Sequence, residues 1–163
     1  MDQVAQENII ESQIVIKTPI GKIAVCYEEN FVTQVHQVAD NSKVVKRKDP
    51  LAIEIQNQFK AYFAKDLDKF NLPFLLKQGT DYQLKVWDQI RKISFGETKT
   101  YGEIAKKIKS GPRAVGNACR RNSLLLIVPC HRVVSASSSG GFLGDSTGKL
   151  AQRKQWLLNH EQI

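Results

Sequence analysis

The chain has 163 residues, of which 42% are hydrophobic and 25% charged, the balance of an ordinary soluble globular protein. Its longest apolar run, residues 124–128, is far shorter than the roughly 18 residues a membrane-spanning helix needs, so we expect no membrane association. The first seven residues are acidic and polar, unlike a secretory signal. The three cysteines are scattered and form no CxxC pair, which argues against disulfides or a zinc finger and indicates a reducing cytoplasm.

The positive charge is concentrated in the second half of the chain. Residues 1–81 carry 10 basic and 11 acidic side chains, whereas residues 82–163 carry 14 basic and 5 acidic ones. The net charges of −1 and +9 indicate a polyanionic partner for the second half, with nucleic acid as the leading candidate. The alternative is a generally basic surface without such a partner.

The first part of the chain is typical of a small sheet followed by a helix. Residues 13–38 alternate in short β-type segments separated by turns near 18–21 and 28–30, which predicts an antiparallel sheet. Residues 40–49 are polar and predict a loop. Apolar residues with helical spacing follow from Pro50, a residue suited to a first helical turn. Residues 66–80 then predict a connection between two domains, at 1–78 and 79–163.

The second part predicts an α-rich domain. Apolar residues with helical spacing from Leu84 end near Phe95 and Gly96. Thr100 and Glu103 have the spacing of a capping box that opens a helix. A turn follows at 110–111, and a helix is predicted from Pro112 to about Asn122, which together give a helix-turn-helix. A buried apolar strand at 124–128 and a final helix at 152–160 complete the domain.

The helix predicted after Pro112 has two different faces. A polar stripe with little bulk at its centre contains Arg113, Gly116, Asn117 and Arg120. The opposite face, predicted to point mostly toward a core, contains Val115, Ala118, Cys119 and Asn122. Small residues flanked by arginines allow a helix to approach a groove and its phosphates closely. An ordinary exposed basic helix is the alternative.

A thiol, an imidazole and a guanidinium are adjacent in the sequence at Cys130, His131 and Arg132. The thiolate is the nucleophilic form of cysteine, and nearby positive charge and a base both increase its population. The run therefore predicts an activated nucleophile. The alternative is a small buried cysteine that only packs.

Several motifs together resemble the O6-alkylguanine-DNA alkyltransferases, also called methylated-DNA–protein-cysteine methyltransferases. The resemblance is dense from residue 72 to 161 and weak before it. Its most specific part is PCHRV at 129–133; the others are YGEIA at 101–105, RAVG at 113–116, Asn122 and WLLNHE at 156–161.

The resemblance implies a role for each matching residue. Cys130 would accept the alkyl group, His131 would remove its proton through a water, and Glu161 would fix the imidazole tautomer. Asn122 would be a structural hinge, and Tyr101 would bind or help rotate the flipped base. Arg113 would enter the duplex where the target nucleotide leaves. The implied DNA-binding residues are Arg113, Ala114, Gly116, Asn117 and Arg120, and the implied substrate pocket is formed by Tyr101, Val133, Phe142 and Leu143.

The resemblance also implies a fold, a function and a partner for the protein. The fold would be a two-domain α/β protein, with a ribonuclease-H-like N-terminal domain and a winged-helix-like C-terminal domain that carries the helix-turn-helix. The function would be direct DNA repair by a single-turnover, irreversible transfer of the O6-alkyl group of guanine to Cys130. The protein would act as a monomer in the minor groove of double-stranded DNA. We expect no cofactor and no metal, because Cys26 and His36 alone do not make a zinc ligand set.

The sequence departs from the family in three places. Phe142 stands where the family commonly has tyrosine, the loop after it is about four residues longer, and Ser123 and Leu124 follow Asn122 where some relatives have prolines. Two other functions remain open at this point: a DNA-binding regulator or damage sensor with an unreactive cysteine, and a multiple-turnover cysteine–histidine hydrolase.

Overall fold

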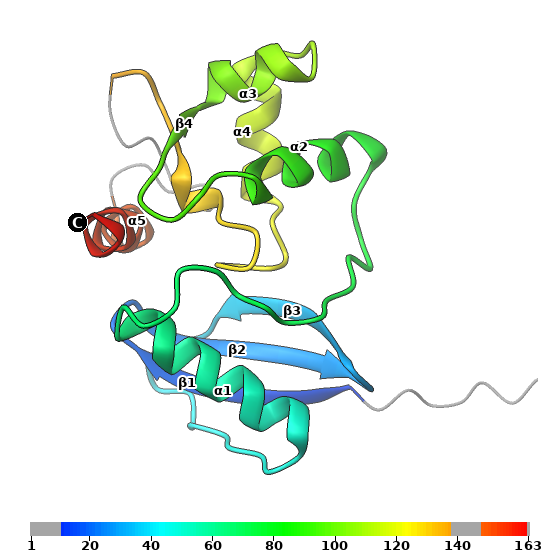
Figure 1. The fold of residues 1–163 in the computed structure, drawn as a ribbon, viewed down its shortest axis with the longest axis vertical. Helices are drawn as coiled ribbons and strands as arrows, with labels where there is room; N and C mark the ends of the chain where they lie inside the picture. The colour runs from blue at the N-terminus through cyan, green and yellow to red at the C-terminus, as the bar shows by residue number, and fades with distance from the viewer. Residues whose placement is uncertain (1–10, 138–147, 163) are drawn as a thin grey trace, which may run out of the picture.

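The computed structural model describes residues 11–137 and 148–162 and divides into an N-terminal and a C-terminal part (Figure 1). The N-terminal part contains β1 (Ser12–Thr18), β2 (Gly21–Glu28), β3 (Phe31–Gln37) and α1 (Pro50–Phe63). The C-terminal part contains α2 (Asp81–Arg91), β4 (Lys99–Thr100), α3 (Tyr101–Lys107), α4 (Pro112–Arg120), a 3-10 turn (Cys130–Arg132), β5 (Val133–Val134) and α5 (Lys149–Glu161). The protein is therefore an α/β protein with two domains, as the sequence predicts.

The N-terminal sheet has the antiparallel order β1-β2-β3, and α1 covers one of its faces (Figure 1). The β-branched residues Ile14, Ile23 and Val25 of the sheet share one core with Ile55 and Phe59 of the helix. The predicted sheet and helix are confirmed. Residues 66–80 form no helix and touch the sheet through a bridge between Val32 and Phe74.

The C-terminal helices begin where local sequence signals place them. Thr80 and Thr100 each cap a helix by accepting a hydrogen bond from the backbone N–H three residues on, and both make complete capping boxes. Helices α3 and α4 form the predicted helix-turn-helix. Pro112 occupies the first turn of α4, which ends at Arg120, two residues before the predicted Asn122.

The predicted buried strand at residues 124–128 is wrong. The segment makes a tight turn instead, in which the Val128 N–H bonds to the Leu124 carbonyl at 2.8 Å and Leu126 has a φ of 69°. Four of its five residues are buried, and Ile127 is partly buried. Its backbone bonds reach the N-terminal domain, since the Leu125 N–H donates to the Val35 carbonyl of β3 at 3.1 Å. Hydrogen bonds to β3, which are distant in sequence, thus determine the backbone of this segment, and its apolar composition alone does not.

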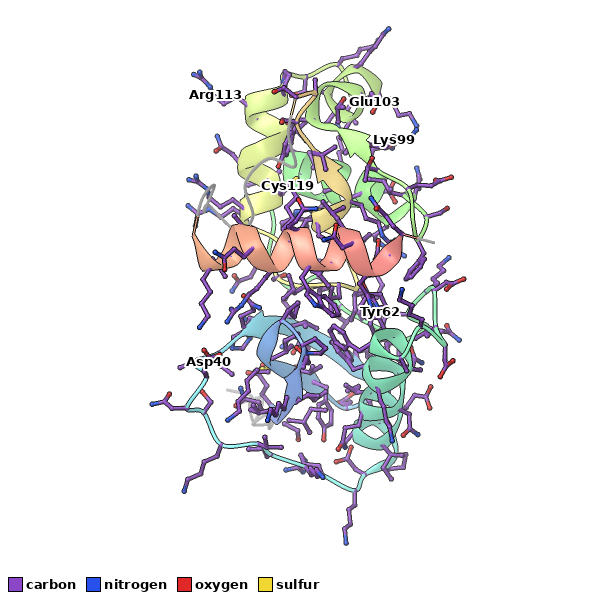
Figure 2. The ribbon with its side chains drawn as sticks, turned by 90° about the vertical axis from the view of Figure 1, so that its left-hand side faces the viewer. Asp40, Tyr62, Lys99, Glu103, Arg113 and Cys119 are labelled. Atoms are coloured by element: carbon purple, nitrogen blue, oxygen red, sulfur yellow. The ribbon has the colours of Figure 1, made fainter. Side chains whose placement is uncertain are left out.

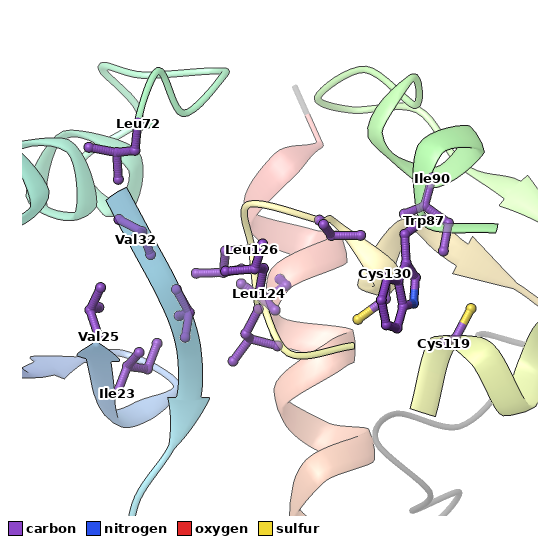
Figure 3. Packing of buried hydrophobic residues seen from close by; sticks show 14 of the residues in the cluster. Ile23, Val25, Val32, Leu72, Trp87, Ile90, Cys119, Leu124, Leu126 and Cys130 are labelled. Carbon is purple, nitrogen blue, oxygen red and sulfur yellow. The ribbon is translucent and has the colours of Figure 1, made fainter. Parts of the chain in front are cut away.

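Helix α5 lies between the two domains in both views of the molecule (Figures 1 and 2). It starts three residues before the predicted helix and ends one residue after it. Leu124 and Leu126 connect Val25 and Val32 of the sheet with Trp87 and Ile90 of α2 in one continuous core, as the labelled side chains show (Figure 3). The turn that precedes Cys130 is therefore anchored on both domains. Within the described residues, no helix has the length and apolar character needed to cross a membrane.

Candidate active site

Cys130 opens the 3-10 turn that follows Pro129, and its side chain is 3% exposed. The Cys130 N–H donates to the Val128 carbonyl at 2.8 Å, and the Arg132 N–H donates to the Pro129 carbonyl at 2.9 Å. These bonds bend the chain sharply on both sides of the thiol. The sulfur is therefore held inside the C-terminal domain rather than on its surface.

Asn122 joins the end of α4 to the cysteine. Its Nδ2 donates to the Val128 carbonyl at 2.8 Å and to Cys130 Sγ at 3.2 Å, while its Oδ1 accepts from the Leu124 N–H at 2.9 Å. The two amide hydrogens have two acceptors and the oxygen has a donor, so the side-chain orientation is fixed. The contacts give Asn122 the geometry of a hinge between α4 and Cys130.

His131 and Glu161 form a buried pair, with His131 Nε2 2.8 Å from Glu161 Oε1 and exposed fractions of 1% and 2%. An ionised carboxylate can only accept a hydrogen bond, so Nε2 carries the proton and Nδ1 is the basic nitrogen. Nδ1 is buried and has no hydrogen-bond partner among residues 11–137 and 148–162. Burial lowers the pKa of His131, which keeps the imidazole neutral and able to take a proton.

The Glu161 carboxylate is held ionised. Burial alone would raise its pKa, but the hydrogen bonds from His131 and Arg132 outweigh burial and bring the pKa well below the ordinary value. Arg132 binds it through two parallel bonds of 2.9 Å, from Nε to Oε2 and from Nη2 to Oε1. Its Nη1 donates to the Ile93 carbonyl at 2.7 Å. The guanidinium expected to activate the thiol is therefore committed to Glu161.

The positive charge that acts on the sulfur comes from Lys154. This side chain on α5 is fully buried, and its Nζ lies 2.6 Å from the Val133 carbonyl and 3.4 Å from the Tyr101 hydroxyl. Burial lowers the pKa of Lys154 to about 8, and negative charge on Cys130 or Cys119 acts in the opposite direction. Sequence reasoning missed this residue because its burial depends on the packing of α5.

The resting thiol is not ionised. Burial raises the pKa of Cys130, and the hydrogen bond from Asn122 and the charge of Lys154 only partly offset that effect. Adjacent positive charge alone therefore does not produce a thiolate in the unliganded protein, and activation of Cys130 by charge together with a base stays a prediction. The arrangement supports a thiol that loses its proton to a base during reaction, with Asn122 and Lys154 placed to stabilise the developing negative charge.

Helix α4 presents the predicted polar face to solvent. Arg113, Asn117 and Arg120 are exposed and Gly116 is partly exposed, whereas Val115, Ala118 and Cys119 are buried. Arg113 projects from the first turn of the helix, away from the rest of the domain (Figure 2). Gly116 has no side chain, so the centre of this face does not project. A β-carbon there would lie 3.9 Å from the ring of Tyr101, so this part of α4 borders that residue. Ala114 is partly buried beside Arg113.

The remaining predicted pocket residues are only partly described. Tyr101 is partly buried at the start of α3, and burial together with the two neighbouring thiols raises its pKa to about 12, so its hydroxyl stays protonated. Val133 is buried in β5 directly after the 3-10 turn. Phe142 and Leu143 lie outside the described residues. Among those that are described, no group of three metal-ligating side chains could hold a metal ion.

Fold and site together define a helix-turn-helix protein with a buried cysteine beside a histidine–glutamate pair. Residues 81–163 match the family model described as 6-O-methylguanine DNA methyltransferase, DNA binding domain. The chain is 35% identical over 158 residues to the constitutive methylated-DNA–protein-cysteine methyltransferase of Bacillus subtilis, covering 90% of this chain and 93% of that protein. A methylated-DNA–protein-cysteine methyltransferase of Methanosarcina mazei is 38% identical over 156 residues, with coverages of 91% and 95%.

Solved structures agree with these relatives. The crystal structure of the Mycobacterium tuberculosis O6-methylguanine methyltransferase matches with a TM-score of 0.80 and 31% identity, over 94% of this chain and 93% of that one. A structure of the protein from the same organism in complex with DNA matches with a TM-score of 0.77 and 35% identity, over 91% and 92%. The chain belongs to the methylated-DNA–protein-cysteine methyltransferase family.

Proposed function

We propose that the protein repairs DNA by direct reversal, transferring the O6-alkyl group of guanine to Cys130. The observation that carries the proposal is the arrangement around the sulfur: Asn122 Nδ2 bonds to Cys130 Sγ, and the next residue, His131, is paired with Glu161 inside the core. His131 Nδ1 is the only basic nitrogen that the Glu161 bond leaves available on that ring. It would take the thiol proton through a water.

The transfer step forms one bond and breaks one. The Cys130 sulfur attacks the alkyl carbon, the bond from that carbon to O6 breaks, and the guanine leaves as its O6 anion or takes up a proton. The product is a thioether, which has no carbonyl for water to attack, so the cysteine is not regenerated. Each protein molecule therefore acts once.

The burial of Cys130 requires the target nucleotide to leave the stack. An alkyl group on O6 lies inside the paired duplex, and the thiol is 3% exposed, so neither can reach the other without extrusion of the base. Tyr101 would contact the extruded base and Arg113 would enter the space it leaves. Val133 would complete the pocket together with Phe142 and Leu143, which lie outside the described residues.

We infer that α4 inserts into the minor groove of double-stranded DNA and that the protein acts as a monomer. The small Gly116 at the centre of the α4 face, flanked by Arg113, Asn117 and Arg120, supports close approach to a groove. The structure of the M. tuberculosis relative in complex with DNA supports DNA as the partner. We also propose a domain boundary at residues 78–79, ribonuclease-H-like and winged-helix-like folds for the two domains, and a reducing, cytoplasmic setting.

The intact mass of the protein after incubation with a duplex containing O6-methylguanine tests this function. We expect a gain of one methyl group in place of one hydrogen, reaching one per protein and then stopping. Cys130→Ala should abolish the gain and retain DNA binding, whereas Cys119→Ala, which removes another buried thiol, should still be methylated.

Two other outcomes would favour the rival functions. DNA binding without any mass gain in the wild-type protein would indicate a regulator or damage sensor. Continued release of product after one equivalent, with ester or amide substrates cleaved, would indicate a cysteine–histidine hydrolase.

A further inference from the structure

The last turn of α1 places a tyrosine from the N-terminal domain inside the catalytic network. Tyr62 is 1% exposed, and its hydroxyl donates to Glu161 Oε1 at 2.7 Å, across 99 residues of sequence. Burial and the neighbouring carboxylate both raise the pKa of Tyr62, so the phenol stays protonated and acts as a donor. None of the alkyl-transfer chemistry above makes use of this contact.

Glu161 Oε1 is shared by three donors. Besides Tyr62 it accepts from His131 Nε2 at 2.8 Å and from Arg132 Nη2 at 2.9 Å, whereas Oε2 accepts from Arg132 Nε. Donors on the same oxygen compete for its negative charge. Each hydrogen bond from Tyr62 or Arg132 therefore reduces the charge available to stabilise a protonated His131.

The position of Tyr62 is fixed by the docking of α1 on α5. His160 Nε2 donates to the Tyr62 carbonyl at 2.9 Å, and the two rings lie 5.3 Å apart between centroids. Trp156 stacks on His160 with a centroid distance of 4.8 Å and also contacts Phe63. The hydroxyl thus reaches Glu161 only while the two domains are packed in this way. Tyr62 lies below α5 in Figure 2.

We propose that Tyr62 is a positioning residue for alkyl transfer, through which the N-terminal domain sets the strength of the bond between Glu161 and His131. The proposal rests on the proposed function, since it concerns the base of that reaction. The charged and titratable groups that face His131 are Glu161, Arg132 and Lys154, and Tyr62 acts on the first of them.

The test is the pH dependence of the single-turnover transfer rate in Tyr62→Phe, which keeps the ring and removes the hydroxyl. Without this donor, more negative charge on Oε1 faces His131, so the protonated imidazole becomes more stable. Neutral His131 is the reactive form, and the acid limb of the profile should move upward by about 0.5 to 1 pH unit. That displacement makes transfer about threefold to tenfold slower on the acid limb.

Tyr27→Phe is a matched control. Tyr27 is 4% exposed in the same domain, and its hydroxyl donates to Asp49 Oδ2 at 2.6 Å at the other end of α1. The Tyr27→Phe variant loses the same kind of bond far from Glu161. Its stability should therefore fall while the pH profile of its transfer rate stays that of the wild type. An NMR titration of His131 in the unreacted proteins gives an independent readout, in which only Tyr62→Phe should raise the pKa.

If Tyr62→Phe has the same acid limb and the same His131 titration as the wild type, the proposal is overturned. The same displacement in Tyr27→Phe would also overturn it, because the effect would then come from stability alone. If the wild-type protein transfers no methyl group, the proposed function fails, while the titration still decides whether Tyr62 controls His131. The two failures are therefore distinguishable.

Discussion

The two sides of the candidate active site are held in different ways. On the base side, Glu161 accepts hydrogen bonds from Tyr62, His131 and Arg132, and all of these groups are buried. On the sulfur side, Cys130 Sγ accepts a 3.2 Å bond from Asn122, and the charge of Lys154 and the backbone N–H groups of Cys130 and His131 also act on it. The proposed base, His131, is thus oriented by buried bonds, whereas the environment of the sulfur favours a neutral thiol. Fixed dipoles and charges of this kind act most strongly where charge develops.

Removing the Glu161 carboxylate, on the base side, should slow alkyl transfer the most. Glu161→Gln leaves Arg132 without its buried counter-charge and allows the wrong tautomer of His131. We expect transfer to fall roughly 1000-fold or more, as when the carboxylate of a serine–histidine–aspartate triad becomes an amide. Stopped-flow single-turnover assays measure this effect. Glu103→Gln, at an exposed capping-box carboxylate, should transfer at close to the wild-type rate, and an equal loss in both variants would contradict the account.

The same carboxylate should make stability depend on pH. The pKa of Glu161 is lower in the folded protein than its ordinary value of 4.5, so the unfolded chain binds more protons. Its contribution to stability is then complete above about pH 5 and is lost as the pH falls toward the folded value. Denaturant unfolding of wild type and Glu161→Gln should therefore converge in acid. A difference that stays constant down to acid pH would contradict the assigned direction.

Changing the sulfur side should have a smaller effect. Lys154→Met keeps most of the side-chain volume but removes the positive charge near Cys130, and we expect transfer to fall roughly 100-fold. Thiol alkylation rates should fall in parallel. Lys149→Met, at an exposed position on the same helix, should leave both rates unchanged. If Lys154→Met reacts as fast as the wild type, the lysine does not act on the thiolate.

Lys154 also predicts a pH effect of the same sign, but in the alkaline range. Its pKa falls from 10.5 to about 8 on folding, so the unfolded chain binds more protons between these two values. Wild-type stability relative to Lys154→Met should therefore rise as the pH increases through this window. Thermal unfolding of both proteins across the window tests the sign, and a relative loss of stability would contradict it.

The smallest predicted effect lies outside both sides of the site. Arg113→Ala should slow transfer from duplex DNA about tenfold. In this variant no side chain fills the space that the extruded nucleotide leaves in the duplex. Transfer from the free base O6-alkylguanine should not change, since no extrusion is needed. Lys46→Ala, in an exposed loop of the N-terminal domain, serves as the control. Equal losses with duplex and free base would remove Arg113 from this role.

Local signals explain why much of the fold could be predicted. The capping box at Thr100, the prolines that open α1 and α4, and the short β-type segments of the N-terminal sheet all act within a few residues. The turn at residues 124–128 could not be predicted, because it depends on pairing with Val35 of β3. The resemblance identified Cys130, His131 and Glu161, but no local pattern could show that Tyr62 and Lys154 reach them across the packed domains.

Locating the methyl group by peptide mass mapping tests the central claim most directly. After reaction with a duplex containing O6-methylguanine, one methyl thioether should be found per protein, on the peptide that contains Cys130. The peptides of Cys26 and Cys119, the other two free and buried thiols, should be unmodified. A methyl group on either of them, or an unmodified Cys130 in folded protein after full exposure to the lesion, would contradict the account.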